Sequence, residues 1–208
     1  MVSGCLAKIV SSDTRHNFLL HYLAALGVVL LTPVIFGVSR LDELLAAQPL
    51  EFFLPLMGAI LMPAVFMPEQ NESIREVVRS KKTPYLGVCF MRLLCGAIVI
   101  TALTGAFVLY MKSMDSVVTM RLFAGSLAST FALGAAGFFA SAVSDNVIVG
   151  YMTAVIYYIC NFGLKDKLGV FFLFSMTTGS FEEKKWLCIL SVVLVVFGFV
   201  LRRLFRER

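Results

Sequence analysis

The chain alternates between long apolar stretches and short polar segments. Several apolar stretches reach the roughly 20 residues that an α-helix needs to cross the hydrocarbon core of a membrane. This pattern predicts an all-α polytopic membrane protein, in which residues 1–208 form a single transmembrane domain. We expect six transmembrane helices, or five or seven if residues 170–176 pair differently. The six expected helices cover about residues 16–38, 50–67, 85–110, 120–143, 147–162 and 186–204.

Two shorter apolar pieces accompany these helices. Residues 4–11, GCLAKIVS, have apolar side chains at helical spacing and predict a short helix in the membrane interface, with a frayed N-terminus as the alternative. Residues 170–176, VFFLFSM, are too few to cross as a helix and favour a re-entrant or interfacial segment. Because Lys8, Asp13 and Arg15 precede the first long apolar stretch, we expect that stretch to stay in the bilayer rather than to be cleaved as a signal peptide.

Residues 68–84, PEQNESIREVVRSKKTP, form the longest polar segment and follow the second expected helix. Pro68 suits the first position of a helix, where a missing N–H costs nothing. The acidic residues near the start and the basic residues near the end match the helix dipole: Glu69 and Glu72, then Arg79, Lys81 and Lys82. Ile74, Val77 and Val78 add a short apolar stripe. We therefore expect an amphipathic helix that binds a soluble partner.

The fourth expected helix carries a stripe of small side chains. An alanine recurs at every fourth residue, at Ala124, Ala128, Ala132, Ala136 and Ala140. Small residues let membrane helices approach closely and gain packing energy. We interpret the stripe as a helix–helix contact, within the subunit or across a dimer. A substrate path is the alternative.

Charge sets the expected orientation of the chain. Only 15% of the residues are charged, whereas a soluble domain carries about 25%. With an even number of transmembrane helices, ten of the 18 lysines and arginines lie on the side of the termini, seven lie on the other side, and Arg92 lies within the third helix. Positive residues collect on the cytoplasmic side, so both termini and residues 68–84 are expected there. The net charge of +5 then faces anionic membrane lipids, and no nucleic acid partner is expected.

Few residues offer chemistry. His16 and His21 are five residues apart and point in different directions on a helix, so no metal site is expected. The chain has no Gly-rich phosphate loop and no nucleophile elbow, which excludes ATP binding and hydrolase chemistry of those kinds. We expect no acidic residue at mid-depth in the helices, which argues against an ion-coupled transporter. The chain is therefore expected to have no catalytic residues and no cofactor of its own.

Polar residues inside two expected helices leave alternatives open. Arg92 either extends its charged end to the cytoplasmic edge or pairs with Glu69 or Glu72. In the fifth helix, four polar side chains either line a path or simply pack inside the protein: Thr153, Tyr157, Tyr158 and Asn161.

In its overall plan the chain resembles the permease subunit of a type-2 ABC exporter. Members of that family have a short amphipathic N-terminal helix and six transmembrane helices with both ends in the cytoplasm. A coupling helix after the second span opens with an acidic residue, and an external segment between the fifth and sixth spans dips back into the membrane. GCLAKIVS, MPAVFMPEQNESIREVVRSKKTPYLGVCFMRLL and VFFLFSM are similar to these features, with Glu69 at the acidic position. The resemblance covers nearly the whole chain, which lacks a large external domain.

The resemblance implies a bacterial plasma-membrane protein that exports a peptide, a drug or a lipid-like amphipathic substrate. A separate cytoplasmic ATPase subunit would bind ATP and Mg and dock on residues 68–84. Ile74, Val77 and Val78 would fill a groove on that subunit. Charged residues would fix the register: Glu72, Arg75, Glu76 and Arg79. Two permeases, identical or sister subunits, would pair around a central path.

Three other functions stay open. The chain is alternatively a non-transporting membrane scaffold or regulatory protein that docks a cytoplasmic partner, a membrane-embedded enzyme, or a small secondary transporter. An ATPase gene beside this one would favour the exporter.

Overall fold

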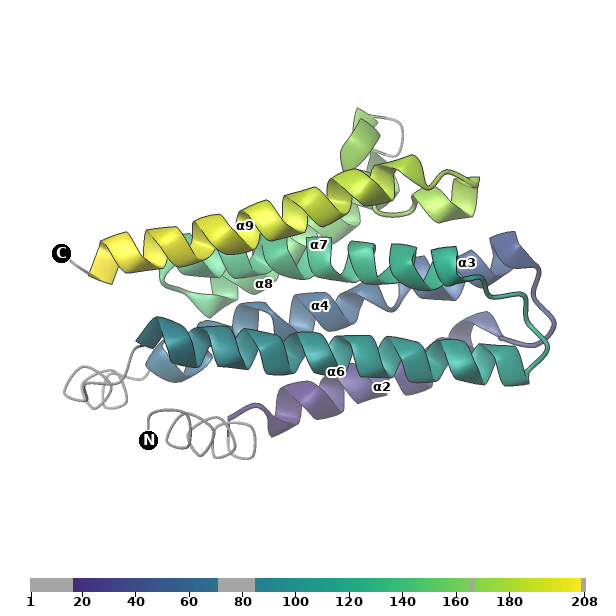
Figure 1. Cartoon of the computed structure of the whole chain (residues 1–208), viewed down its shortest axis with the longest axis horizontal. Coiled ribbons are helices and arrows are strands. Elements are labelled where there is room, and N and C mark those ends of the chain that lie inside the picture. The colour runs from purple at the N-terminus through teal and green to yellow at the C-terminus, as the bar shows by residue number, and fades with distance from the viewer. Residues whose placement is uncertain (1–16, 71–84, 165–166, 207–208) are drawn as a thin grey trace.

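The computed structural model describes residues 17–70, 85–164 and 167–206, and every regular element in these ranges is helical (Figure 1). The α-helices are α2 (Leu19–Phe36), α3 (Glu43–Phe52), α4 (Pro55–Leu61), α6 (Tyr85–Ser113), α7 (Met120–Ser144), α8 (Val147–Gly163) and α9 (Glu182–Arg206). The remaining described elements are the 3-10 helices η1 (Pro63–Gln70), η3 (Gly169–Phe171) and η4 (Ser175–Thr178). The predicted all-α class is confirmed for the described chain.

Five helical segments of the described chain are long and apolar enough to cross a membrane. They are Leu19–Phe36, Glu43–Pro68, Tyr85–Ser113, Met120–Ser144 and Glu182–Leu204. The helix α8 is also apolar, but its 17 residues are at the lower limit of the length required. The chain is therefore a multi-pass membrane protein. A sixth crossing by α8 stays a prediction, as do the kind of membrane and the orientation.

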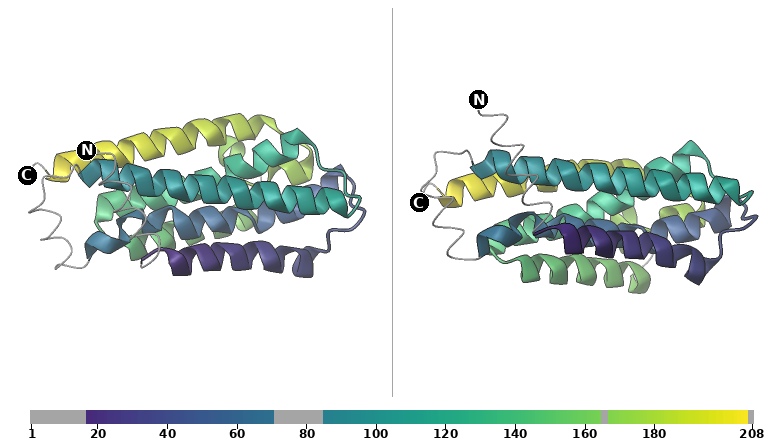
Figure 2. Two further views of the ribbon diagram at one scale, coloured as in Figure 1. Left: turned by 60° about the horizontal axis from the view of Figure 1, so that its bottom comes forward. Right: turned by 90° about the horizontal axis from the view of Figure 1, so that it is seen from below.

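The long helices run back and forth along one axis, so the bundle has two ends (Figure 1, Figure 2). We call one the terminal end, because it holds the C-terminal end of α9 together with the end of η1 and the start of α6. The opposite, distal end holds the α2–α3 and α6–α7 turns and the connection between α8 and α9. The two turns are bound to each other: Arg40 N–H donates to Met114 O at 3.0 Å, and Ser116 Oγ donates to Val38 O at 2.6 Å.

The second membrane-crossing segment begins at Glu43 rather than near residue 50, so its predicted start is wrong. Asp42 caps α3 by accepting the Leu45 N–H at 3.0 Å. An aspartate cap starts a helix whatever the hydropathy of the residues that follow. The expected boundary followed hydropathy alone and therefore assigned Glu43 to a loop.

Prolines divide this segment into three pieces. Pro55 lies in the first turn of α4 and Pro63 begins η1, because proline needs no N–H partner at the start of a helix. Pro68 was expected to open the polar helix, but it lies inside η1 instead. The rest of that predicted helix, residues 71–84, lies outside the described residues, as does the predicted interfacial helix at 4–11.

The last helix, α9, begins at Glu182, earlier than the predicted start near residue 186. Ser180 Oγ donates to the Glu183 carboxylate across the first turn. Acidic residues stabilise the N-terminal end of a helix through its dipole. The first turn of α9 is therefore helical, although its polar residues placed it outside the helix predicted from hydropathy. The fourth and fifth helices begin at the predicted residues, and the third is helical from Tyr85, the first described residue after the gap. All three end one to three residues later than predicted.

The helix α7 lies in the middle of the bundle and contacts α4, α6, α8 and α9 (Figure 1). Ala128 and Ala132 of its alanine stripe are buried, Ala136 and Ala140 are half-buried, and Ala124 is exposed. The middle of the stripe therefore packs inside this chain. A contact across a dimer stays a prediction.

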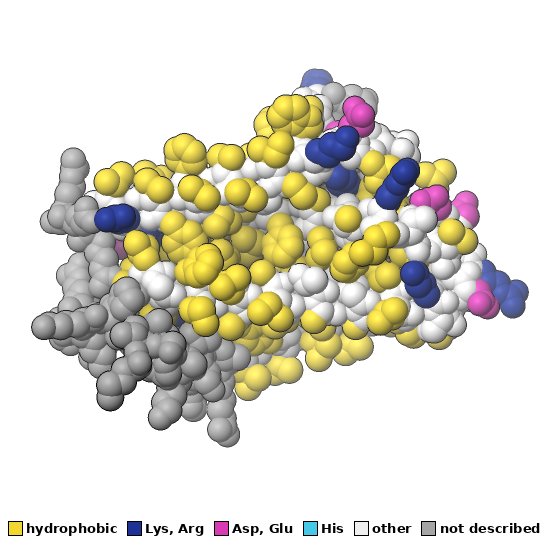
Figure 3. Space-filling view, viewed as in Figure 1, with side chains coloured by type: hydrophobic (Ala, Val, Ile, Leu, Met, Phe, Trp, Pro, Cys, Tyr) yellow, Lys and Arg dark blue, Asp and Glu magenta, His cyan; other side chains and the backbone are white. Residues whose placement is uncertain are grey.

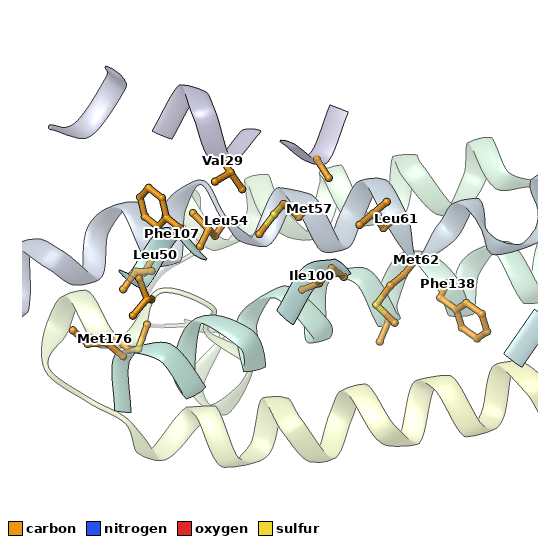
Figure 4. Close-up of a cluster of buried hydrophobic side chains, with 14 of the residues drawn as sticks. Val29, Leu50, Leu54, Met57, Leu61, Met62, Ile100, Phe107, Phe138 and Met176 are labelled. Atoms are coloured by element: carbon orange, nitrogen blue, oxygen red, sulfur yellow. The ribbon is translucent and has the colours of Figure 1, made fainter. Parts of the chain in front are cut away.

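Glycines bring α7 into backbone contact with two neighbouring helices. A Cβ atom on Gly58 of α4 would lie 2.0 Å from Thr130 O, and one on Gly150 of α8 would lie 2.5 Å from Gly137 O. Close contact of this kind is how small residues stabilise membrane helices. The core around the crossings is filled by large apolar side chains (Figure 4), among them Leu54, Met57, Met62, Ile100 and Phe138.

The outer surface of the bundle is also apolar (Figure 3). Charged side chains in this view gather mainly at the distal end, and apolar side chains cover the length between the ends. An apolar surface this extensive is rare on soluble proteins and fits contact with lipid tails. Prominent exposed side chains on α2 and α9 are Leu20, Leu30, Val34, Val192 and Phe197.

Candidate functional site: a buried ion pair on the α8–α9 connection

Two charged residues meet inside the distal half of the bundle. Glu51 lies in the last turn of α3, roughly 12 Å along the helix axis from Glu43. Its side chain is fully buried. Lys184 lies in the first turn of α9 and is 6% exposed. Their carboxylate and ammonium groups form a salt bridge, which joins the second membrane-crossing segment to the last one.

The Glu51 carboxylate also binds the chain between α8 and α9. Its Oε1 accepts the Met176 N–H at 2.9 Å, and its Oε2 accepts the Thr177 N–H at 2.9 Å. Each carboxylate oxygen therefore has a backbone donor, and one of them also has the Lys184 ammonium. Hydrogen bonds to an ionised group are stronger than those between neutral groups, so the carboxylate fixes this backbone firmly.

The Lys184 ammonium has an acceptor for each of its three N–H bonds. Besides Glu51, it donates to Ser129 Oγ at 2.6 Å and to Leu173 O. Ser129 Oγ in turn donates to Leu173 O at 3.0 Å. Removing a charge from water costs several kcal/mol, and an ion pair repays this only when its other hydrogen bonds are also made. This pair meets that condition.

Residues 169–178 of the connection, of which 173–176 are buried, are here called the linker segment. The helix α8 holds it as well: Leu173 N–H donates to Asn161 Oδ1 at 2.7 Å, and Tyr157 Oη donates to Phe171 O at 2.7 Å. Asn161 Nδ2 donates to Tyr157 O at 2.8 Å, which orients the amide. Polar groups from α3, α7, α8 and α9 thus converge on about ten residues of chain.

Aromatic side chains of α3 and α8 pack against Phe174 of the linker segment. The Phe174 ring centre lies 4.7 Å from that of Phe162, 4.9 Å from that of Phe52 and 5.6 Å from that of Tyr158. Aromatic pairs at these distances add stability beyond the area that they bury. Of the segment predicted as re-entrant or interfacial, residues 173–176 are therefore packed into the helix bundle, whereas Val170 and Phe171 are exposed.

The structure brings together three of the four polar residues that were predicted in the fifth helix. Tyr157 and Asn161 bind the linker segment, and Tyr158 Oη donates to a backbone oxygen of α3. Thr153 lies apart and donates to a carbonyl of its own helix at 2.9 Å. The first three residues thus have a structural role in this conformation, and a path-lining role stays a prediction.

The predicted docking surface is not covered by the structure. The side chain of Glu69 is not described, and the remaining residues of that surface lie outside the described residues: Glu72, Ile74, Arg75, Glu76, Val77, Val78 and Arg79.

Arg92 is 7% exposed and turns into the bundle near the terminal end. Its Nη1 donates to Val65 O at 3.2 Å, and its guanidinium carbon lies 5.9 Å from the centre of the Phe18 ring. The proposed pairing with Glu69 or Glu72 concerns side chains that the structure does not describe.

The ion pair suits holding the chain in place better than it suits catalysis. Glu51 and Lys184 neutralise each other, and their donors and acceptors are occupied by the backbone and by Ser129. Within the described ranges, no group of three or more His, Cys, Asp and Glu side chains is placed to hold a metal. The arrangement therefore binds a segment of its own chain.

Neither Glu51 nor Lys184 was predicted from the sequence to belong to a functional site. Glu51 stands between Leu50 and Phe52 in an apolar stretch, and an ionisable residue in such a stretch is by itself a reason to suspect function. With α3 beginning at Glu43, Glu51 lies well inside a membrane-crossing segment, which corrects the expectation about acidic residues. Lys184 lies within the run EEKK and carried no comparable signal.

No known protein family, curated protein or solved structure matches this chain. The basis for a proposed function is therefore the arrangement of the chain itself.

Proposed function

We propose that this chain is the membrane-spanning subunit of an ATP-driven ABC exporter that works with a separate ATPase subunit. The observation that carries the proposal is where the described chain ends before residue 71 and resumes at residue 85. Both η1, which ends at Gln70, and α6, which begins to be described at Tyr85, have these ends at the terminal end of the bundle, where α9 also ends (Figure 1). In the proposal, the residues between them present the apolar stripe predicted from the sequence to a protein outside the membrane.

The connection between α8 and α9 also supports the proposal. Permeases of type-2 ABC exporters have an external segment there that dips back into the membrane. In this chain the corresponding residues 173–176 are buried against other helices. In the proposal, the coupling helix and this external segment belong to opposite ends of the bundle, as an exporter of this type requires.

In this proposal the ATPase subunit binds ATP and Mg, and this chain contributes no catalytic residue. Residues 68–84 transmit the movement of the ATPase to the helices. Ile74, Val77 and Val78 contact the ATPase, and a second copy or a sister permease completes the path. The cargo is a peptide, a drug or a lipid-like amphipathic molecule, because the path would run between apolar helices.

The test is co-purification of the full-length chain with a candidate ABC ATPase from the same organism. Replacing both Ile74 and Val77 by Asp should abolish recovery of the ATPase, because two charges would replace the apolar stripe. A matched control, S73D/S80D, adds the same charge on the polar flank of the expected helix and should retain the ATPase. Both variants should insert in the membrane at the level of the unaltered chain.

Full ATPase recovery and cargo transport by the Ile74/Val77 variant would refute the docking assignment. A co-purifying partner with no ATPase activity would refute the exporter itself and favour the scaffold function.

A further inference from the structure

We propose that the Glu51–Lys184 pair is a releasable latch. In the described conformation it holds the linker segment inside the distal end of the bundle, and its separation frees that segment to leave. The inference is independent of the proposed transport function, because it rests only on contacts within this chain.

The two charged side chains bind the linker segment directly. Three backbone groups of that segment bind the two charges: Met176 N–H and Thr177 N–H bind the carboxylate, and Leu173 O binds the ammonium. All three contacts are lost when Glu51 moves away with α3 and Lys184 moves away with α9. The remaining polar contacts come from Asn161 and Tyr157 of α8 and from Ser129 of α7, whose Oγ donates to Leu173 O at 3.0 Å, and they leave the α3 and α9 sides free.

An ion pair is better suited to release than an apolar contact would be. Each charge loses its hydration when it is buried, and it regains that hydration when the distal end admits water. Breaking the pair is therefore compensated in the open state, whereas breaking an apolar contact is not. The pair lies within roughly three helical turns of the end of the bundle, so water has a short way to travel.

The linker segment also has points at which it can turn. Gly169 has φ 51° and Gly179 has φ 80°, and these two glycines flank the buried residues. Glycine adopts and leaves such angles at little cost. Between them, Met176 occupies a seat on α7: a Cβ atom on Gly125 would lie 2.3 Å from its Sδ atom. The linker segment thus has a glycine at which the backbone can turn near each end, and between them a methionine that packs closely against α7.

Ser175 offers a probe that does not disturb this seat. It is 1% exposed, and its Oγ atom has no hydrogen-bond partner among the described residues, so Ser175→Cys removes no contact. The natural Cys89 of α6 is also buried and serves as an internal reference in the same molecule. The other cysteines are replaced by alanine. The full-length chain in phosphatidylcholine nanodiscs is treated with a charged maleimide, and labelling at each cysteine is followed by mass spectrometry.

Lys184→Met should raise the labelling rate at position 175 at least tenfold, because the carboxylate left behind has no counter-charge and is costly to keep buried. The double variant E51Q/K184M loses the ammonium donor and one of the two carboxylate acceptors, but it leaves no unpaired charge, so it should label faster than the unaltered chain and more slowly than Lys184→Met. Labelling of Cys89 should stay constant in every variant.

An unchanged rate in Lys184→Met would overturn the latch. A double variant that labels as slowly as the unaltered chain would also overturn it, because the linker segment would then stay in place without the pair. This second comparison holds even if Lys184→Met alone does not fold. A parallel rise at Cys89 would mean general unfolding and would equally refute a local release.

Discussion

Replacing Gly58 by alanine is expected to destabilise the bundle by about 2 kcal/mol. The added Cβ atom would lie 2.0 Å from Thr130 O, whereas a carbon and an oxygen in contact are about 3.3 Å apart. The obstacle is backbone, so no side-chain rotation relieves it, and α4 and α7 must separate by about 1 Å at this crossing. Overpacking of this kind costs about 1–3 kcal/mol, and the better helix propensity of alanine returns about 1 kcal/mol or less.

Two further glycines provide graded controls for this prediction. Gly96→Ala on α6 meets nothing within 4 Å, so it should be neutral or stabilising by up to about 1 kcal/mol. Gly125→Ala meets the Met176 Sδ atom at 2.3 Å, but a methionine side chain can turn away, so its cost should lie between the other two.

The assay is unfolding of the purified chain in mixed micelles with increasing SDS, followed by circular dichroism. The expected order of stability is Gly96→Ala, then Gly125→Ala, then Gly58→Ala. Equal midpoints for Gly58→Ala and Gly96→Ala would refute the close α4–α7 contact on which the reasoning depends.

Two other predictions use the same titration. Asn161→Leu should cost about 1–3 kcal/mol, because it leaves the buried Leu173 N–H without an acceptor, and an unchanged midpoint would contradict that hydrogen bond. Asp145→Ala should cost at most about 1 kcal/mol, because Asp145 is half-exposed where it pairs with Arg202. Arg202→Ala should cost more than Asp145→Ala, since its guanidinium carbon also lies 4.6 Å from the centre of the Phe66 ring, and equal losses would show that this ring contact contributes nothing.

Hydropathy predicted the start of a helix correctly where the helix begins together with an apolar stretch. The fourth and fifth helices begin at Met120 and Val147, as predicted, because a largely apolar stretch begins at each. Asn146 also caps the fifth helix by accepting the Ile148 N–H at 2.9 Å. The second and last helices begin earlier than predicted, because their first turns are polar and depend on end effects. The Asp42 cap starts one of them, and acidic residues at the N-terminal end start the other.

The candidate site was only partly accessible from sequence. Tyr157, Tyr158 and Asn161 were singled out because polar residues are rare in an apolar helix, yet their partners are backbone atoms that no pattern identifies. The linker segment was recognised as too short to cross the membrane. Which helices it packs against depends on contacts between distant parts of the chain.

The amino-acid sequence is sufficient to specify a multi-pass helical membrane protein, because long apolar stretches have no stable alternative to helices in lipid. It does not reveal that Glu51 and Lys184 form a pair. A buried charge is tolerated only beside its counter-charge, and here that proximity exists because α3, α9 and the linker segment pack against α7. The tertiary structure thus decides that these two residues pair with each other and bind the linker segment, a role that the sequence does not indicate.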